Sequence, residues 1–109
     1  MSGITHLTSE NFQNEVQNHN GIAMVDFYAD WCGPCKMLAP VLEKMAGDAQ
    51  WAGVKFLKLN IDTAREVALK SGIRAVPTII FFKNGVEVER LMGFHTETVL
   101  GEKIRNHSL

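Results

Sequence analysis

The sequence has few cysteines, no long apolar run and no recognisable leader segment. Two cysteines among 109 residues cannot build the several disulfides that hold small secreted domains together, so a reducing compartment fits better than the extracellular one. No segment approaches the roughly 18 apolar residues of a membrane-spanning helix, and the first residues lack the apolar stretch of a signal peptide. We therefore expect a cytoplasmic protein that does not enter a membrane.

Charge of either sign is also not in excess. The 11 Lys and Arg residues nearly balance the 12 Asp and Glu residues, which leaves no basic stripe for nucleic acid or for an anionic membrane. Internal repeats, low-complexity tracts and Pro/Gly/Ser linkers are missing too. At this length, with 46% hydrophobic residues, the chain predicts one domain, residues 1–109, around a single core.

Hydrophobic periodicity and turn residues predict the element order βαβαβαββα. The predicted strands cover residues 4–7, 22–29, 54–61, 78–83 and 86–92. The expected helix caps are Thr8 or Ser9, Asp62 or Thr63, and Thr96, and Pro40 is expected to kink the second helix. Strands joined through a helix run parallel, whereas the Asn84-Gly85 turn joins two antiparallel strands. The sequence thus predicts an α/β fold with a mixed, five-stranded central sheet and helices on both faces.

The only two cysteines, Cys32 and Cys35, lie between the second strand and the second helix. Active groups gather at such junctions in α/β sheets. A purely structural disulfide across so short a ring would stabilise the folded state by only about 2 kcal/mol. A structural zinc site needs four ligands, and a haem attachment site needs histidine after Cys35, where Lys36 stands. The histidines, which are scattered along the chain, are His6, His19, His95 and His107. A redox pair is therefore favoured over a metal site or inert packing, and no metal is expected.

The two thiols are expected to differ in reactivity. A helix N-terminus carries unpaired N–H groups and partial positive charge, which favour the thiolate of Cys32. We expect Cys32 to face solvent and act as the nucleophile, while Cys35, one turn deeper, stays protonated and later resolves the mixed disulfide. Gly33 lets a partner's backbone approach closely, and Pro34 fits the start of a helix.

The run WCGPCK, residues 31–36, follows VDFYAD, with Lys58 in the third predicted strand, Val76-Pro77-Thr78 before the fourth and Gly93 after the fifth. In order and spacing, these motifs resemble the thioredoxin family over nearly the whole chain. The resemblance implies the thioredoxin fold and a protein-disulfide reductase that serves as an electron carrier in cell redox homeostasis. It further implies no bound cofactor, with electrons supplied by NADPH through thioredoxin reductase, disulfide-containing client proteins, and a monomer.

The family also implies a role for a carboxylate in the second strand. The residue matching Asp26 assists proton transfer to and from the deeper thiol, and the residue matching Lys58 lies near it. Burial among apolar residues raises the pKa of a carboxyl group, which suits a general base for Cys35. The alternative is an Asp26–Lys58 ion pair that takes no part in catalysis.

A client-docking surface is implied around the cysteines. Pro77 is expected to follow a cis peptide bond, and the backbone of Val76 to pair with an extended client segment. The residues implied to form this apolar surface are Trp31, Gly33, Pro34, Ile61, Val76, Pro77, Met92, Gly93 and Phe94. An aromatic residue such as Phe94 is nevertheless more often part of a core than of a contact surface.

Some positions depart from the family pattern, and two rival functions stay open. Tyr28 stands where many members carry tryptophan, and Trp51 and Gly101 match no functional motif of the family. A disulfide oxidase or isomerase is disfavoured because Pro34 adds no positive charge that would overstabilise the thiolate. A scaffold or processivity subunit of the same fold is the other alternative, since a scaffold can retain its cysteine pair.

Overall fold

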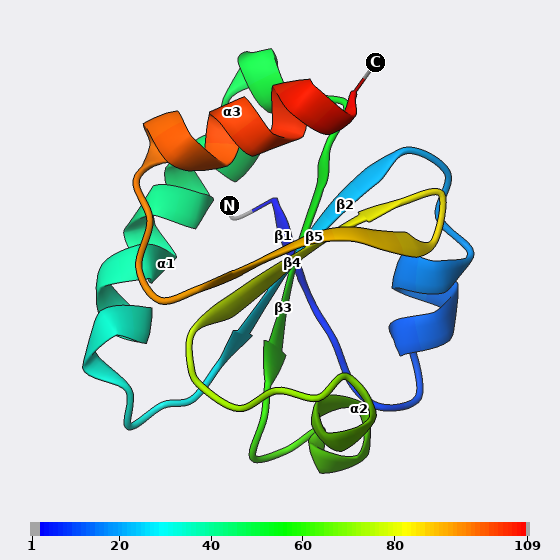
Figure 1. Cartoon of the computed structure of the whole chain (residues 1–109), viewed down its shortest axis with the longest axis vertical. Helices are drawn as coiled ribbons and strands as arrows, with labels where there is room; N and C mark the ends of the chain where they lie inside the picture. Colours follow the sequence, from blue (N-terminus) through cyan, green and yellow to red (C-terminus); the bar gives the residue numbers. More distant parts are fainter. Residues whose placement is uncertain (1–2, 109) are drawn as a thin grey trace.

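A computed structural model describes residues 3–108; residues 1, 2 and 109 of the expected 1–109 domain lie outside the described part. One sheet, in the strand order β1-β3-β2-β4-β5, runs through the molecule (Figure 1). Its strands are β1 (Ile4–His6), β2 (Ile22–Tyr28), β3 (Lys55–Asn60), β4 (Thr78–Lys83) and β5 (Val86–Met92). The helices are α1 (Gly33–Ala46), α2 (Arg65–Lys70) and α3 (Glu97–His107), with short helical segments at Gln13–Gln17 and Ala49–Trp51.

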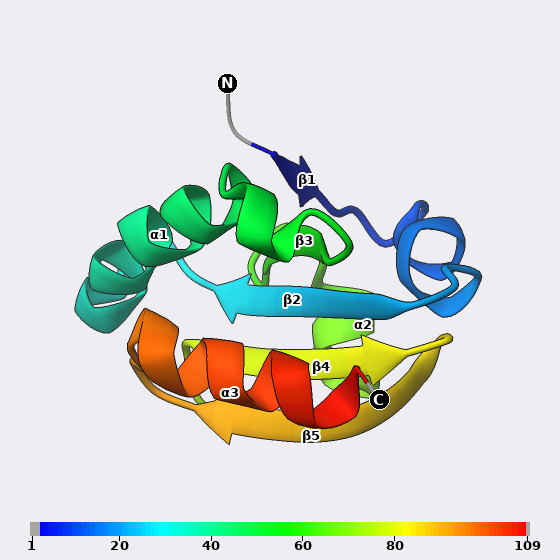
Figure 2. The same cartoon turned by 90° about the horizontal axis from the view of Figure 1, so that it is seen from above.

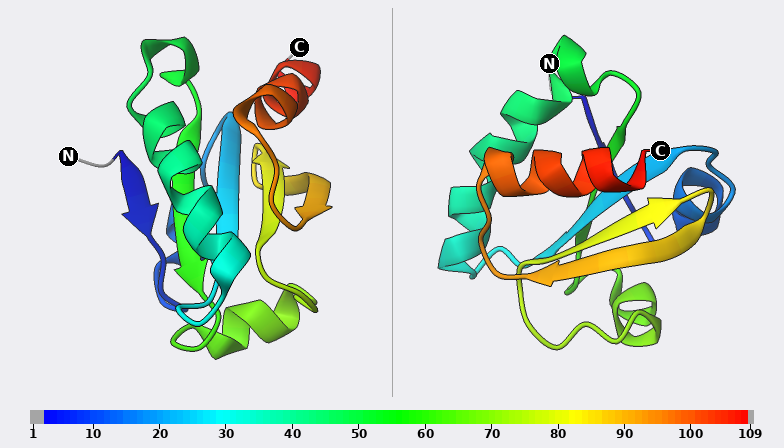
Figure 3. Two further views of the ribbon diagram at one scale, coloured as in Figure 1. Left: turned by 90° about the vertical axis from the view of Figure 1, so that its left-hand side faces the viewer. Right: turned by 45° about the horizontal axis from the view of Figure 1, so that its top comes forward.

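The pairing of the strands confirms the predicted mixed sheet. β3 runs parallel to both β1 and β2, and β4 runs antiparallel to β2 and to β5. Figure 2 shows β4 and β5 side by side with opposite directions, and Figure 3 shows β1 and β5 at the two edges. The central strand β2 has six buried residues in a row, as its unbroken apolar run predicts for a strand covered on both faces.

Helices cover both faces of the sheet, and each face has its own apolar layer. On one face, α1 and α3 contribute Leu38 and Leu100 to a cluster that includes Phe81 of β4. On the other face, α2 contributes Val67 to a cluster that includes Val16 and Val25. No helix within residues 3–108 combines the length and hydropathy that crossing a membrane requires.

Of the three predicted helix caps, the one for α2 is wrong. Thr8 caps the turn that leads into the first helical segment: its Oγ1 accepts the N–H of Asn11 at 3.1 Å, and the Asn11 side chain accepts the N–H of Thr8 at 2.7 Å. The segment Gln13–Gln17 itself begins after Phe12 with no further side-chain cap. Helix α2 begins after Ala64, also without a side-chain cap. The Asp62 carboxylate is engaged elsewhere, with the indole of Trp31. Thr96, in contrast, caps α3 as predicted, since its Oγ1 accepts the N–H of Val99 at 3.4 Å.

The Asn84-Gly85 turn forms as predicted. Both residues have positive φ, 52° and 84°, which a tight two-residue hairpin requires. Gly85 is also needed for space, because a Cβ there would clash with the carbonyl oxygen of Gln17. The side chain of Asn84 accepts the N–H of Gly21 at 2.7 Å and so ties the turn to the start of β2.

Trp51 and Gly101, which match no functional motif, are packing partners. Trp51 is buried, and a Cβ at position 101 would lie 2.8 Å from two of its ring carbons. The indole N–H donates to Glu97 at 3.3 Å, and Glu97 also pairs with Lys44 at 2.8 Å. A glycine is therefore required inside α3 so that this helix can approach the segment that follows α1.

Candidate redox site

The cysteine pair lies where the chain leaves β2 and enters α1. Cys32 has extended backbone geometry and is the N-cap of the helix, and Pro34 lies in the first turn. Cys32 and Cys35 form a disulfide, with their Cα atoms 5.3 Å apart. The Cys32 Sγ accepts the backbone N–H of Cys35 at 3.1 Å. The sulfur of Cys32 therefore occupies the place where a helix N-terminus favours negative charge.

The expected solvent-facing position of Cys32 is not found in this disulfide form. Cys32 and Cys35 are each only 4% exposed. The closed bond holds the sulfur of Cys32 against its partner, and the carbonyl oxygen of Val76 lies 3.5 Å from it. Ile61 and Val76 pack against the cluster that contains the two cysteines. The hydrophobic pattern of the helix could not predict that Cys32 is buried, because the residues that cover it, Ile61 and Val76, are distant from it in sequence.

Asp26 is buried in the centre of the sheet. It is 1% exposed, it is paired in register with Lys58 of β3, and its Oδ1 has no hydrogen-bond partner among the described residues. Loss of hydration raises its pKa to about 7, although the positive charge of Lys58 acts in the opposite direction. This carboxyl group can therefore take up and release a proton near neutral pH.

A cavity of about 180 Å³ joins Asp26 to the deeper cysteine. Its walls include Asp26, Cys35 and Lys58, together with Tyr28, Ala29, Asp30, Lys36 and Ala39. The Nζ of Lys58 lies 4.6 Å from the centroid of the Tyr28 ring, which is a cation–π distance. Tyr28, a departure from the family pattern, thus faces the same cation as Asp26, and the sequence alone did not indicate this contact.

Three of the apolar side chains expected on the docking surface are exposed. Trp31 is 69% exposed, Met92 63% and Phe94 38%, so these three lie on the surface, and the Trp31 indole donates to Asp62 at 3.0 Å. A Cβ at Gly33 would meet nothing within 4 Å, which leaves the backbone there approachable. Met37 of α1 is another exposed apolar residue, at 62%, that was not among the predicted ones. Only its position, out of phase with the buried residues of the helix, indicates its exposure from sequence.

The segment before β4 is held close to the cysteines. The Val76–Pro77 peptide bond is cis, as the resemblance implied. The carbonyl oxygen of Pro77 accepts the N–H of Gly93 at 2.8 Å, and Gly93 has a φ of 87°, which favours glycine. This hydrogen bond joins the start of β4 to the end of β5 through two of the residues expected on the docking surface.

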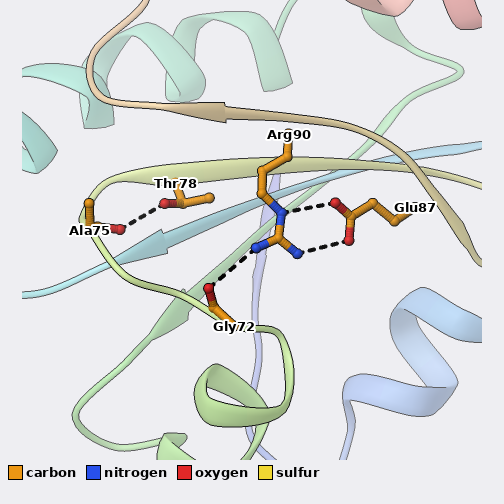
Figure 4. A network of polar contacts seen from close by, with 5 residues as sticks. All are labelled: Gly72, Ala75, Thr78, Glu87 and Arg90. Carbon is orange, nitrogen blue, oxygen red and sulfur yellow. Dashed lines mark hydrogen bonds and ion pairs between the residues drawn. The ribbon is translucent and has the colours of Figure 1, made fainter.

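A polar network that the sequence did not indicate supports the same segment (Figure 4). Arg90 of β5 makes two hydrogen bonds of 2.9 Å to Glu87, and its Nη1 reaches the carbonyl oxygen of Gly72 at 3.5 Å. The buried Thr78 donates its hydroxyl to the carbonyl oxygen of Ala75 at 2.7 Å. These contacts fix both ends of the stretch that leads from α2 to Pro77.

Nothing in the described part of the chain brings three metal-ligating side chains together. Two of the histidines weighed as ligands have other contacts: the ring of His95 lies 3.1 Å from the carbonyl oxygen of Gly93, and that of His107 lies 2.8 Å from Glu89. Near the disulfide, the structure therefore offers as candidate site residues the buried Asp26 with Lys58 beside it and the exposed Trp31.

The family model named Thioredoxin matches residues 3–106. The chain belongs to the thioredoxin family. A thioredoxin from Staphylococcus saprophyticus is 42% identical over 104 residues, which cover 95% of this chain and 97% of the relative. One from Chlamydia muridarum is 42% identical over 101 residues, or 93% and 95% of the two chains. Among solved structures, a thioredoxin from Nicotiana alata has a TM-score of 0.87 at 37% identity, covering 99% of this chain and 95% of the other.

Membership confirms the thioredoxin fold and the general activity expected from the sequence. With its Cys32–Cys35 pair closed in the structure, the chain is a protein-disulfide reductase with a redox-active centre. Members of the thioredoxin family generally work without a bound cofactor, act on disulfide-containing clients, and are reduced by thioredoxin reductase. These findings favour the reductase function over the oxidase and scaffold alternatives.

Proposed function

We propose that Cys32 attacks client disulfides as a thiolate and that Cys35 resolves the product. The Cys32 thiolate bonds to one client sulfur, and the other client sulfur leaves as a thiolate. Cys35 then loses its proton and attacks the Cys32 sulfur, which closes the Cys32–Cys35 bond and releases the second client sulfur. Two electrons pass to the client, and the pair is left oxidised, which is the state of the structure.

One observation carries this assignment of roles. The Sγ of Cys32 accepts the N–H of Cys35 at 3.1 Å at the N-terminus of α1. A hydrogen bond and a helix terminus at that sulfur both stabilise negative charge more than they stabilise a neutral thiol. Cys35 lies inside the helix and has no such position, so the ionised sulfur in the reduced protein is that of Cys32.

Asp26 is the proton acceptor for Cys35 in this proposal. The cavity that both residues line gives a water-sized path between them, and a pKa of about 7 lets the carboxylate take a proton near neutral pH. Lys58, next to Asp26 across the β2–β3 pair, keeps part of this carboxyl group ionised. A purely structural Asp26–Lys58 pair is the alternative that the Asp26→Asn variant tests below.

Clients dock on the apolar surface beside the disulfide. The backbone of Val76, whose carbonyl oxygen lies 3.5 Å from the Cys32 sulfur, can pair with an extended client segment. Trp31 lines a cavity with Val76, and both Trp31 and Met92 are exposed. The proposed docking residues are Trp31, Gly33, Pro34, Ile61, Val76, Pro77, Met92, Gly93 and Phe94. We further propose that the chain works as a single-domain monomer in the cytoplasm and receives electrons from NADPH through thioredoxin reductase.

Insulin reduction tests the activity. The purified protein, supplied with NADPH and a thioredoxin reductase, is expected to reduce insulin disulfides and consume NADPH at a rate proportional to its concentration. Several reductases are tried, because the cognate one is defined by surface fit. NADPH consumption no faster than with the reductase alone, for every reductase, contradicts the proposal.

Trapping tests the roles of the two cysteines. Cys35→Ser leaves the attacking thiol but removes the resolving one, so this variant is expected to accumulate disulfide-linked clients from a lysate. Cys32→Ser is the matched control and is expected to accumulate none. Equal, reductant-insensitive capture by both variants would point to scaffolding instead of exchange.

A further inference from the structure

A groove lined by both apolar and polar side chains leads away from the disulfide along α2. It consists of two adjoining cavities, of about 330 and 280 Å³, that share Ile61 and Ile73 as a common wall. The first cavity reaches Trp31 and Val76, beside the cysteines, and the second reaches Leu69. Leu69 is 79% exposed, although an apolar side chain on α2 could have been buried. The groove is thus continuous with the proposed docking surface.

Two arginines border the groove. Arg74 lines the first cavity and Arg65 the second, and both are exposed. Within residues 3–108 no hydrogen bond or ion pair engages either guanidinium group. The acid in the lining, Asp62, accepts the indole N–H of Trp31 at 3.0 Å. Both arginines are therefore available for carboxylates from outside the chain.

The wall between the two cavities is rigidly supported. Ile73 donates its backbone N–H to Ala68 at 3.2 Å. Its neighbours are held by the contacts of Figure 4, from Arg90 to Gly72 and from Thr78 to Ala75. The hydrogen bonds on both sides of Ile73 support the shape that the groove has in the structure, which lowers the cost of ordering it on binding.

We propose that this groove binds a segment of the client polypeptide, displaced from the reacting cysteine, that presents an apolar side chain next to Asp or Glu. This inference rests on the proposed function, since the client enters beside Val76. Ile73 and Leu69 contact the apolar side chain, and Arg65 and Arg74 pair with the carboxylates.

Short peptides test the groove directly. Each carries one cysteine as a mixed disulfide with glutathione and, at varied spacing on either side of it, Leu followed by two Glu, two Gln or two Lys. The measurement is the rate at which the fully reduced protein reduces each peptide, followed by mass spectrometry. At the best spacing, the Glu peptide is expected to react about threefold to tenfold faster than the Lys peptide, a range set by exposed ion pairs. High salt should reduce this preference.

Charge reversal identifies the groove as the source. Arg65→Glu and Arg74→Glu are each expected to abolish or reverse the preference for the Glu peptide over the Lys peptide. Lys70→Glu is the matched control, because it makes the same charge change on α2 but lines a different cavity. Leu69→Ser is expected to slow all Leu-containing peptides without lowering the thermal midpoint, since Leu69 is exposed.

The outcomes distinguish a failure of this inference from a failure of the proposed function. Equal rates for the Glu and Lys peptides at every spacing, or a loss of preference in Lys70→Glu as large as in Arg74→Glu, overturn the inference while insulin reduction persists. A dimer in light scattering that Arg74→Glu dissociates also overturns it, because a second copy would then occupy the groove. Failure to reduce any peptide, or insulin, overturns the proposed function itself.

Discussion

Asp26, the proposed proton acceptor, is a buried acid whose pKa is raised by its surroundings. The apolar run around it predicted a raised pKa, and the value of about 7 agrees with that expectation. The sequence also indicated Lys58 as its neighbour through the family resemblance. The ring of Tyr28 over Lys58 was not predictable, because a cation–π contact depends on side-chain geometry across two strands.

Asp26→Asn is expected to slow release of the client from the mixed disulfide more than it slows the first attack at neutral pH. The amide cannot accept the proton of Cys35, whereas the Cys32 thiolate needs no base for its own attack. Rapid-mixing experiments on a fluorescent client resolve the two steps. Equal slowing of both steps would remove the proton-transfer role and leave a structural one.

Lys58→Gln is expected to raise the pKa of Asp26 above its value of about 7. The lysine charge is the contribution that lowers this pKa, so its removal leaves the effect of burial unopposed. NMR titration of the Asp26 carboxyl carbon measures the shift, with Lys70→Gln as a control remote from the cavity that Asp26 lines. An unchanged or lowered pKa in Lys58→Gln would show that the two groups do not interact.

At the scale of the elements, patterns with strong local causes were predicted best. β4 and β5 have the bounds that the sequence indicated, since the Asn84-Gly85 turn fixes their register. The cap of α2 was predicted wrongly, because the Asp62 carboxylate has other partners within reach and accepts the Trp31 indole N–H instead. Local sequence specifies a capable side chain but does not say which partner it takes.

Gly101→Ala is expected to destabilise the protein, although alanine is the better helix former. A Cβ at 2.8 Å from the Trp51 ring forces a shift, and overpacking costs about 1–3 kcal/mol, against a gain of about 1 kcal/mol in helix propensity. In a Trp51→Leu background, the same change is expected to be neutral or stabilising. Guanidinium unfolding of the four proteins measures the coupling. Equal effects of Gly101→Ala in both backgrounds would contradict the contact.

At the scale of the whole molecule, the burial of Asp26 makes stability depend on pH. Its pKa is about 7 in the folded protein against 3.8 for the ordinary group, so between these values the folded state holds a proton that the unfolded chain has released. The free energy of unfolding contributed by this group is therefore highest below about pH 4, falls as the pH rises to about 7, and stays low above that. The total change is on the order of 4 kcal/mol.

Asp26→Asn is expected to remove this fall in the free energy of unfolding with rising pH. The variant and the parent should unfold with similar free energies near pH 4, and the variant should be more stable by several kcal/mol at about pH 8. Guanidinium unfolding of the oxidised proteins across this range makes the comparison. Parallel curves for the two proteins would mean that Asp26 does not titrate between these limits.

At the site, the sequence did not predict which residues from distant segments come into contact. The motif around Cys32 placed the reactive pair, and the resemblance supplied the docking residues. The link from Arg90 to Gly72, the cover over Cys32 and the groove along α2 come from segments brought together only by the sheet order. Hydrophobic period predicts which residues of one element are buried, but it holds no information on which distant side chains meet.

The two reacting sulfurs lie within a single turn at the start of α1, on Cα atoms 5.3 Å apart. The two sulfurs can therefore meet through a change within that turn alone. We expect the rate of each exchange to depend on how well the partner fits the surface around the bond.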